Sequence, residues 1–495
     1  MRRIRLLVLY LVATAPVLLV GCAQPSGDPF PVEVSADGDV EVYAQFGEEL
    51  EEIRQMLRIP GMSAAIVKDD QMVWARGFGY ADVADQILAT PDTPFHLASL
   101  TKPFAAVVVM QLVEEGLIDL DDPIAEYGID LESSGVIRVR HLLSHTSEGE
   151  PGAEFIYNGW RYYFLDPIIQ SVTGKSFREF LAERVLTPLE MDNTAPNPMS
   201  QGEGFLTSFA IWLNPQNRRV FGQLASPYRI DSSYNVVDAQ YEQFFMPGAG
   251  LISTATDMAR FYIALDQNLL ISEETKEMMF APTVSTSGNE LPHGLGFFTQ
   301  THDNVRLIWH YGWWPPCASA FVIHAPEEHL TFIILATTDN LSRPYQLGSG
   351  NFLPLDSAVG LAFYRTFIYE PKYRTSVPRV DWDADAETIM ATLREPINPG
   401  VQKLLERELI SRRRLYDSMG RSDLSDKLSA IHSQVYAPSQ LENHPSLQSV
   451  GNPPSEFVTP ITMHHRLAIL LFVLLLILLP GLWWVIRRRR RRDVR

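Results

Sequence analysis

The chain has 495 residues, of which 46% are hydrophobic and 20% are charged, and its formal net charge is −18 at pH 7. This composition is ordinary for a globular protein, and the length allows one large domain with appended segments. The acidic balance excludes nucleic acid as a partner for the bulk of the surface, because phosphates and acidic side chains repel each other.

The N-terminus has the pattern of a secretory signal. Three arginines precede an apolar stretch over 6–20, which predicts a signal peptide over 1–21. The stretch ends in Leu19-Val20-Gly21-Cys22, which is similar to a bacterial lipobox and implies lipidation of the Cys22 thiol. Ordinary cleavage with a free cysteine is the alternative. Since Cys317 is the only other cysteine, a lipidated Cys22 leaves no internal disulfide.

The C-terminus carries an apolar run over 467–486 that is long enough to cross a bilayer, followed by a basic tail over 487–495. The positive-inside rule places these arginines in the cytoplasm. We therefore expect a C-terminal transmembrane helix, with the rest of the protein exported to a bacterial periplasm or cell surface. The expected membrane contacts are the Cys22 lipid and 467–486.

Between these ends, the chain alternates helical and strand patterns without a βαβ rhythm. Residues 22–46 are rich in Pro, Gly, Asp and Ser and predict a tether. The elements expected after it are a helix at 47–57, strands at 62–68 and 71–80, a helix from Ser99 to Gly116, a mostly helical insertion from 139 with helices at 162–172 and 177–185, loops over 192–247, a helix at 258–269 capped by Thr256 or Asp257, strands at 294–299, 306–311, 318–323 and 331–337, and a helix at 355–369. This order predicts an α+β fold, in which helices flank an antiparallel sheet.

We place the α+β domain at 47–366. The pattern of the sequence changes after it. The region 367–460 predicts a helical extension and a linker, with an amphipathic helical pair at 401–417 and 423–435. The sequence contains no internal repeat, no metal-ligand cluster and no phosphate-binding loop, so neither a metal nor another cofactor is expected.

Ser99 and Lys102 lie one helical turn apart and form a candidate nucleophile pair. A serine hydroxyl needs a group that takes its proton, and a buried lysine with a lowered pKa can assist. The Ser-x-x-Lys spacing is expected about once by chance in a chain of this length. The alternative is a serine that caps a core helix.

Further segments follow in a recognisable order. They are Phe95-His-Leu-Ala-Ser99-Leu-Thr-Lys102, Arg140-His-Leu-Leu-Ser-His145-Thr-Ser147, Tyr157-Asn158-Gly159, Pro247-Gly-Ala-Gly250 with Ser253-Thr-Ala-Thr-Asp257, and His310-Tyr311-Gly312. Together they resemble the class C branch of the serine β-lactamase and penicillin-binding-protein family. The resemblance covers roughly 47–366 and implies the β-lactamase/D,D-peptidase-like fold.

The resemblance also implies roles for individual residues. Ser99 would form an acyl-enzyme, and Lys102 and Tyr157 would take and return protons, in an order that the sequence leaves open. His310, Gly312 and Trp313 would bind the substrate, with the backbone N–H groups of Ser99 and Trp313 as the oxyanion hole. His145 is expected to tie a loop to the core.

Two positions depart from the family pattern. Gly159 stands where the family has the asparagine of Tyr-x-Asn, and Trp313-Trp314-Pro315-Pro316 replaces a small, glycine-rich sequence. We therefore expect an exported serine hydrolase that acts on a small ester, a D-amino-acid peptide or a β-lactam-like compound, with esterase or peptidase activity favoured over true β-lactamase activity. The alternative is a non-catalytic binding or sensory protein on a degenerate β-lactamase fold.

Overall fold

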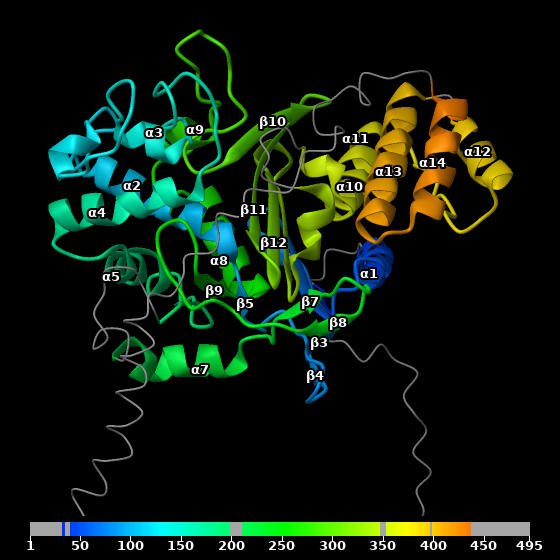
Figure 1. Cartoon of the computed structure of the whole chain (residues 1–495), viewed down its shortest axis with the longest axis horizontal. Helices are drawn as coiled ribbons and strands as arrows, with labels where there is room; N and C mark the ends of the chain where they lie inside the picture. The colour runs from blue at the N-terminus through cyan, green and yellow to red at the C-terminus, as the bar shows by residue number, and fades with distance from the viewer. Residues whose placement is uncertain (1–31, 35–39, 199–209, 347–352, 397, 437–495) are drawn as a thin grey trace, which may run out of the picture. The chain divides into compact units, whose positions relative to one another are not determined.

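The computed structural model describes residues 32–34, 40–198, 210–346, 353–396 and 398–436 (Figure 1). These residues belong to one compact unit that ends at Pro438. The predicted signal peptide at 1–21, Cys22 and the basic tail at 487–495 lie outside the described residues, so these predictions stay untested.

The predicted transmembrane helix requires correction. Residues 467–486 lie outside the described residues, and no helix within the described ranges is long and apolar enough to cross a bilayer. An apolar run predicts that its side chains are removed from water. A transmembrane helix also requires about 20 consecutive residues in helical conformation, and hydropathy alone does not establish that conformation. The part of the predicted fold class that holds is the α+β architecture.

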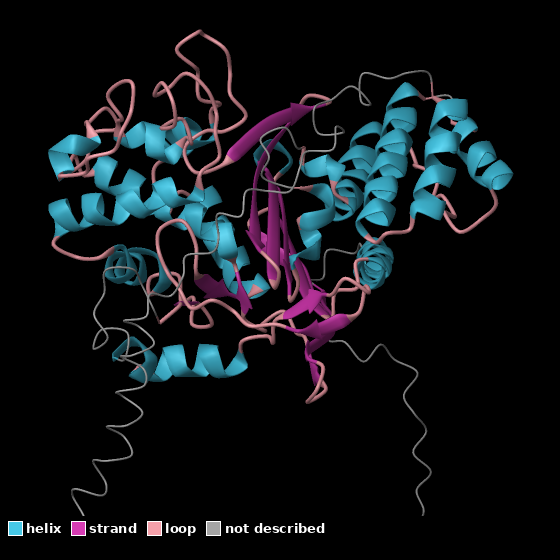
Figure 2. Cartoon of the chain, in the orientation of Figure 1, coloured by secondary structure: helices cyan, strands magenta, loops and turns pink. Residues whose placement is uncertain are grey.

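An antiparallel sheet lies at the centre of this unit (Figure 2). Its strand order is β1–β3–β2–β13–β12–β11–β10, and β4 pairs with β3. The bounds are β1 Val32–Val34, β2 Gly61–Lys68, β3 Gln71–Asp82, β4 Ile87–Leu88, β10 Phe298–His302, β11 Val305–Trp314, β12 Ala318–Ala325 and β13 Leu330–Ala336. Two small sheets contain β5 Phe95–His96, β6 Ala195–Pro196 and β9 Leu251–Ser253, and β7 Tyr228–Ile230 and β8 Val236–Asp238.

Helices cover both faces of the sheet (Figures 1 and 2). Their bounds are α1 Val40–Met56, α2 Thr101–Glu114, α3 Val139–Leu143, α4 Leu165–Thr173, α5 Phe177–Leu181, α7 Pro215–Gln223, α8 Ala255–Asp266, α9 Glu273–Phe280, α10 Ala358–Phe363, α11 Glu370–Tyr373, α12 Ala386–Arg394, α13 Pro399–Ser418 and α14 Ser422–Val435. Successive side chains of a strand point to opposite faces, so Ile333 joins one hydrophobic cluster with α2 and α8, and Ile334 joins another with α1, α10 and α13. Every residue of β12 and β13 is buried, as expected for strands covered on both faces.

Helix α2 lies inside the first cluster. Its residues from Thr101 to Leu112 are all buried, including Lys102. Helix α2 is therefore buried on every side and has no solvent-facing stripe over these residues. Ser99 itself lies just before α2, in the single turn η1 (Ala98–Leu100).

Several predicted boundaries shift. The strand expected at 294–299 begins instead at Phe298, because the backbone at Gly294 and Gly296 packs closely against other elements. A Cβ at Gly296 would lie 2.3 Å from the Cβ of Ala106. Thr254, rather than Thr256 or Asp257, caps α8 and accepts a hydrogen bond from the Asp257 N–H. The region 192–247 contains α7, β7 and β8 as well as loops.

The predicted helical pair of the extension is confirmed as α13 and α14, and α12 precedes it. Leu404 and Leu409 of α13 belong to the same hydrophobic cluster as Phe332 of the sheet. Arg407 also forms an ion pair with Asp356 at 3.1 Å, just before α10. The extension therefore packs directly on the sheet-covering helices.

Candidate functional site

Ser99 and Lys102 are in direct contact. The Lys102 Nζ donates hydrogen bonds to the Ser99 Oγ at 2.9 Å and to the carbonyl oxygen of Gly248 at 2.8 Å. Lys102 is fully buried, and no carboxylate within the described ranges pairs with it. Burial lowers the pKa of the Lys102 amine to about 7, because desolvation disfavours the ammonium form. Near neutral pH, Lys102 can therefore accept a proton from Ser99.

The turn that carries Ser99 is fixed by its neighbours. Ala98 has a φ of +49°, a conformation that non-glycine residues rarely adopt. The Ala98 N–H donates to Nδ1 of His96 at 3.1 Å, and the Thr101 hydroxyl donates to the Ala98 carbonyl oxygen at 2.7 Å. These bonds hold an unfavourable backbone conformation in place at the candidate nucleophile.

Tyr157 lies close to both Ser99 and Lys102. The Lys102 Nζ is 5.1 Å from the centroid of the Tyr157 ring, and the Tyr157 hydroxyl is buried without a hydrogen bond among the described residues. Burial raises the pKa of Tyr157 to about 12, while the nearby Ser99 and Tyr311 side chains oppose this rise. Tyr157 is therefore protonated at neutral pH, and Lys102 is the more readily deprotonated of the two.

The edge of the sheet reaches the nucleophile turn along β11. Strand β10 pairs with β11 only as far as Phe298 opposite Trp309, so 310–314 have β12 on one side and the Ser99 turn on the other. A Cβ at Gly312 would lie 2.1 Å from the carbonyl oxygen of Leu97. Only glycine allows this approach of the two backbones.

The three predicted binding residues occupy different environments. His310 is fully buried; its ring centroid lies 6.5 Å from that of Tyr157, and its Nδ1 is 2.7 Å from the carbonyl oxygen of Tyr311. Burial and the nearby Lys102 hold the pKa of His310 well below its usual value. Trp313 is half-buried, and its Nε1 donates to the Asp339 carboxylate at 3.3 Å. Strand β11 ends at Trp314, as the two following prolines predict.

Gly159 faces the site without a side chain. A Cβ built at Gly159 would lie 3.4 Å from the Lys102 Nζ. The neighbouring Asn158 cannot substitute for the missing amide, because its Oδ1 accepts from the Trp160 N–H at 2.9 Å and its Nδ2 donates to Glu148 at 2.6 Å. The structure thus brings together Ser99, Lys102 and Tyr157 but leaves the amide position empty.

Three features of this region were missed from the sequence: the position of His293 beside His145, the Gly248 carbonyl oxygen and Asp339. His145 and His293 are fully buried with Nε2 atoms that have no partner within the described chain, and their ring centroids are 5.0 Å apart. Gly248 supplies the second acceptor for Lys102, and Asp339 anchors Trp313. Gly248 lies in a block that the resemblance includes, whereas His293 and Asp339 have no local sequence signal. Within the described ranges, no group of three or more His, Cys, Asp or Glu side chains is arranged to hold a metal ion.

Comparison with known proteins agrees with this geometry. A family model described as β-lactamase matches residues 48–348. The chain belongs to the β-lactamase family. Among curated relatives, this β-lactamase-family chain is 25% identical over 323 residues to penicillin-binding protein 4* of Bacillus subtilis (strain 168), covering 54% of this chain and 66% of that protein. It is 24% identical over 331 residues to protein flp of Staphylococcus aureus (strain MW2), covering 58% and 61%.

Among solved structures, the octameric penicillin-binding protein homologue from Pyrococcus abyssi superimposes with a TM-score of 0.53 at 23% sequence identity. The match covers 60% of this chain and 74% of that chain, and it supports the fold. The chain spans less than two thirds of the length of the curated relatives named above. The family match ends at residue 348, so the extension after residue 366 lies outside it, although the extension packs on the family domain.

Proposed function

We propose that this β-lactamase-family chain is a serine hydrolase that cleaves an ester or amide through an acyl-enzyme on Ser99. The observation that carries the proposal is the hydrogen bond between the Ser99 Oγ and a fully buried Lys102 whose pKa is lowered to about 7. A buried lysine without a counter-ion destabilises the folded state, so its retention beside a serine favours a catalytic role.

The proposed reaction has two steps. The Ser99 Oγ attacks the substrate carbonyl carbon while its proton passes to neutral Lys102, directly or through the Tyr157 hydroxyl. The alcohol or amine leaves with that proton, and water then hydrolyses the ester on Ser99. The backbone N–H groups of Ser99 and Trp313 would donate to the oxyanion, since β11 runs beside the Ser99 turn.

Small esters and D-amino-acid peptides suit the site better than β-lactams. The amide missing at Gly159 removes one donor that could orient a substrate, and His310 is a buried neutral imidazole rather than a cation at the rim. The Trp313 Nε1 donates to Asp339, and the Trp313 ring packs against the cluster that contains Trp309 and Tyr311. We therefore propose esterase or peptidase activity above β-lactamase activity.

A fluorophosphonate probe tests the nucleophile. The full chain should form a covalent adduct on Ser99, and Ser99→Ala should abolish it. Ser147→Ala is a matched control, because Ser147 is also buried but its hydroxyl forms no hydrogen bond with Lys102 or Tyr157 in the described structure. An adduct that survives in Ser99→Ala would refute the proposal.

The second candidate is a binding or sensory protein on the same fold, favoured by the extension that packs on the family domain. Turnover separates the two. A hydrolase should release nitrophenol continuously from nitrophenyl acyl esters or D-alanine from D-alanyl dipeptides, and Tyr157→Phe should slow the release. Stoichiometric binding without release would support the sensory protein instead.

Export and lipidation of Cys22 also remain proposals. They rest on the pattern of residues 1–22 in the sequence. A Cys22→Ser variant should lose incorporation of labelled fatty acid in bacterial cells, whereas Cys317→Ser should not. Equal labelling of both variants would exclude lipidation at Cys22.

A further inference from the structure

The end of β11 directs its backbone groups alternately toward β12 and toward the Ser99 turn. In an antiparallel strand, the N–H and C=O of one residue point to the same edge, and those of the next residue point to the opposite edge. The N–H of Cys317, which comes directly before β12, donates to the carbonyl oxygen of Trp314 at 2.8 Å. The backbone of Trp314 therefore faces β12, and so does that of Gly312, two residues earlier. The N–H of Trp313 faces the other edge, toward the Ser99 turn.

Ser342 fixes the peptide unit that carries this N–H. The Ser342 hydroxyl donates to the carbonyl oxygen of Gly312 at 3.1 Å, and Ser342 is fully buried. The carbonyl oxygen of Gly312 and the N–H of Trp313 belong to one planar trans peptide unit, in which they point in opposite directions. A hydrogen bond that holds the carbonyl oxygen on the side of β12 therefore also directs the N–H toward Ser99. The same hydrogen bond polarises the peptide unit and makes its N–H a stronger donor.

Asp339 fixes the side chain of the same residue. The Trp313 Nε1 donates to the Asp339 carboxylate at 3.3 Å, and the Trp313 ring packs against the hydrophobic cluster on the face of the sheet away from α2. Asp339 is almost fully buried; burial raises the pKa of its carboxyl to about 6, while Trp313 and Arg343 oppose this rise. Asp339 is therefore ionised at pH 8 and accepts a charge-assisted hydrogen bond from Trp313.

The segment that carries both side chains is itself anchored. The Leu341 N–H donates to the Ser319 Oγ of β12 at 3.1 Å. The Asn340 side chain donates to the carbonyl oxygen of Leu57 at 2.6 Å, directly after α1. Residues 338–342 are all buried. Hydrogen bonds from a segment that is held in this way can fix the geometry of a neighbouring site.

We propose that Ser342 and Asp339 are positioning residues for the oxyanion hole, in which they hold the Trp313 N–H toward the substrate oxygen. This inference rests on the proposed function, because the hole matters only if Ser99 forms an acyl-enzyme. Both residues act through another group: Ser342 through the Gly312 carbonyl, and Asp339 through the Trp313 ring. Formation and hydrolysis of the acyl-enzyme both pass through an oxyanion, so both steps should depend on this support.

Turnover of p-nitrophenyl acetate by the full chain at pH 8 tests the role of Ser342. Ser342→Ala should lower kcat about tenfold and leave KM within about twofold, because the lost interaction acts on the transition state. Ser342→Thr keeps a hydroxyl and should retain kcat within about twofold of wild type.

Ser357→Ala is the matched control. Ser357 is also fully buried, and its hydroxyl also donates to a backbone carbonyl oxygen, that of Pro354 at 2.8 Å, but it lies at the start of α10. This variant should lower the thermal stability and leave kcat unchanged, because it removes a helix cap far from the oxyanion hole.

A double-mutant cycle tests the role of Asp339. Asp339→Asn removes the charge at nearly constant size and should lower kcat several-fold. Trp313→Phe removes the Nε1 donor and should have a similar effect. If the two residues act as a pair, adding Asp339→Asn to Trp313→Phe should lower kcat no further.

A fluorophosphonate adduct on Ser99 separates the failure of this inference from that of the proposed function. If the wild-type chain shows neither adduct nor turnover, the proposed function fails, and this inference fails with it. If the wild-type chain is active but Ser342→Ala and Asp339→Asn keep its kcat, only the positioning role is overturned. An equal loss of kcat in Ser342→Ala and Ser357→Ala would overturn it as well.

Discussion

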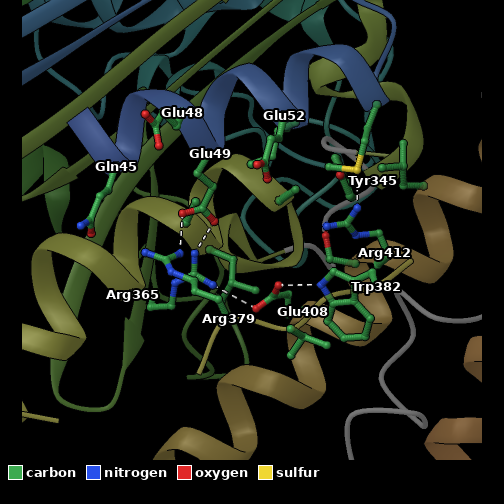
Figure 3. A pocket seen from close by; sticks show the side chains of 18 residues that line it. Gln45, Glu48, Glu49, Glu52, Tyr345, Arg365, Arg379, Trp382, Glu408 and Arg412 are labelled. Carbon is green, nitrogen blue, oxygen red and sulfur yellow. Dashed lines mark hydrogen bonds and ion pairs between the residues drawn. The ribbon is translucent and has the colours of Figure 1, made fainter. Parts of the chain in front are cut away.

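The two faces of the central sheet differ in whether a buried basic side chain has carboxylate partners. On one face, Lys102 is buried beside neutral histidines with no carboxylate partner within the described chain. On the other face, Arg365 is equally buried, but Glu49 and Glu408 both pair with it. Uncompensated burial destabilises the fold and changes a pKa, whereas compensated burial holds helices together. This difference supports the proposal that the first face carries the chemistry, whereas the paired charges of the second face hold helices together (Figure 3).

The largest effect should come from Lys102→Met, which removes the proposed proton acceptor without changing the apolar surroundings. Turnover of an activated ester should fall about 10³-fold. Thermal melting at pH 7 should not decrease, because burial of the lysine disfavours the folded state. A variant that loses stability but keeps its activity would reverse the assignment of this face.

Arg365→Met should have the opposite effects on the two quantities: it should lower stability and leave activity nearly unchanged. It leaves Glu49 and Glu408 without their shared partner, so the free energy of unfolding should decrease by about 3 kcal/mol. The activity of the remaining folded protein should stay within about twofold of wild type. Denaturant titration and ester turnover measure the two quantities. Arg184→Met is the control, because its pair with Glu115 is more than one third exposed and should change stability by less than about 1 kcal/mol.

The pH dependence of turnover should follow Lys102. Its pKa of about 7 lies below its ordinary value, so the amine is neutral and able to accept a proton above pH 7 and protonated below it. The kcat/KM for an activated ester should rise about tenfold from pH 6 to pH 8 and then level off. His145 and His310 are held neutral by burial and should add no inflection. A flat profile over this range would contradict the proposed role of Lys102.

The smallest effect should come from Gly159→Asn. The position has room for a Cβ at 3.4 Å from the Lys102 Nζ, so the family's amide can be restored at the edge of the site. Acylation by a penicillin should become several-fold faster, whereas Gly159→Ala should leave the rate unchanged. Stopped-flow measurement of acylation distinguishes the two variants. No difference between them would show that the missing amide does not limit acylation.

The sequence predicted local features better than distant contacts. Ser99 and Lys102 are three residues apart, and the confirmed strand at 331–337 is a continuous apolar run, so both are visible in short windows. The Gly248 carbonyl lies 146 residues from Lys102 along the chain, and Glu49 lies 316 residues from Arg365. No spacing rule connects such positions. The second hydrogen bond of Lys102 and the pairing of Glu49 with Arg365 therefore required the structure.

The hydrophobic cluster behind the sheet joins the extension to the family domain. Residues of the extension such as Leu405 share that cluster with Leu50 and Ile334 of the family domain. The family match ends at residue 348, but the packed interior does not end there. A chain shortened at 366 would expose this apolar surface to water and is expected to aggregate. The extension is therefore part of the same folded unit as the domain that it covers.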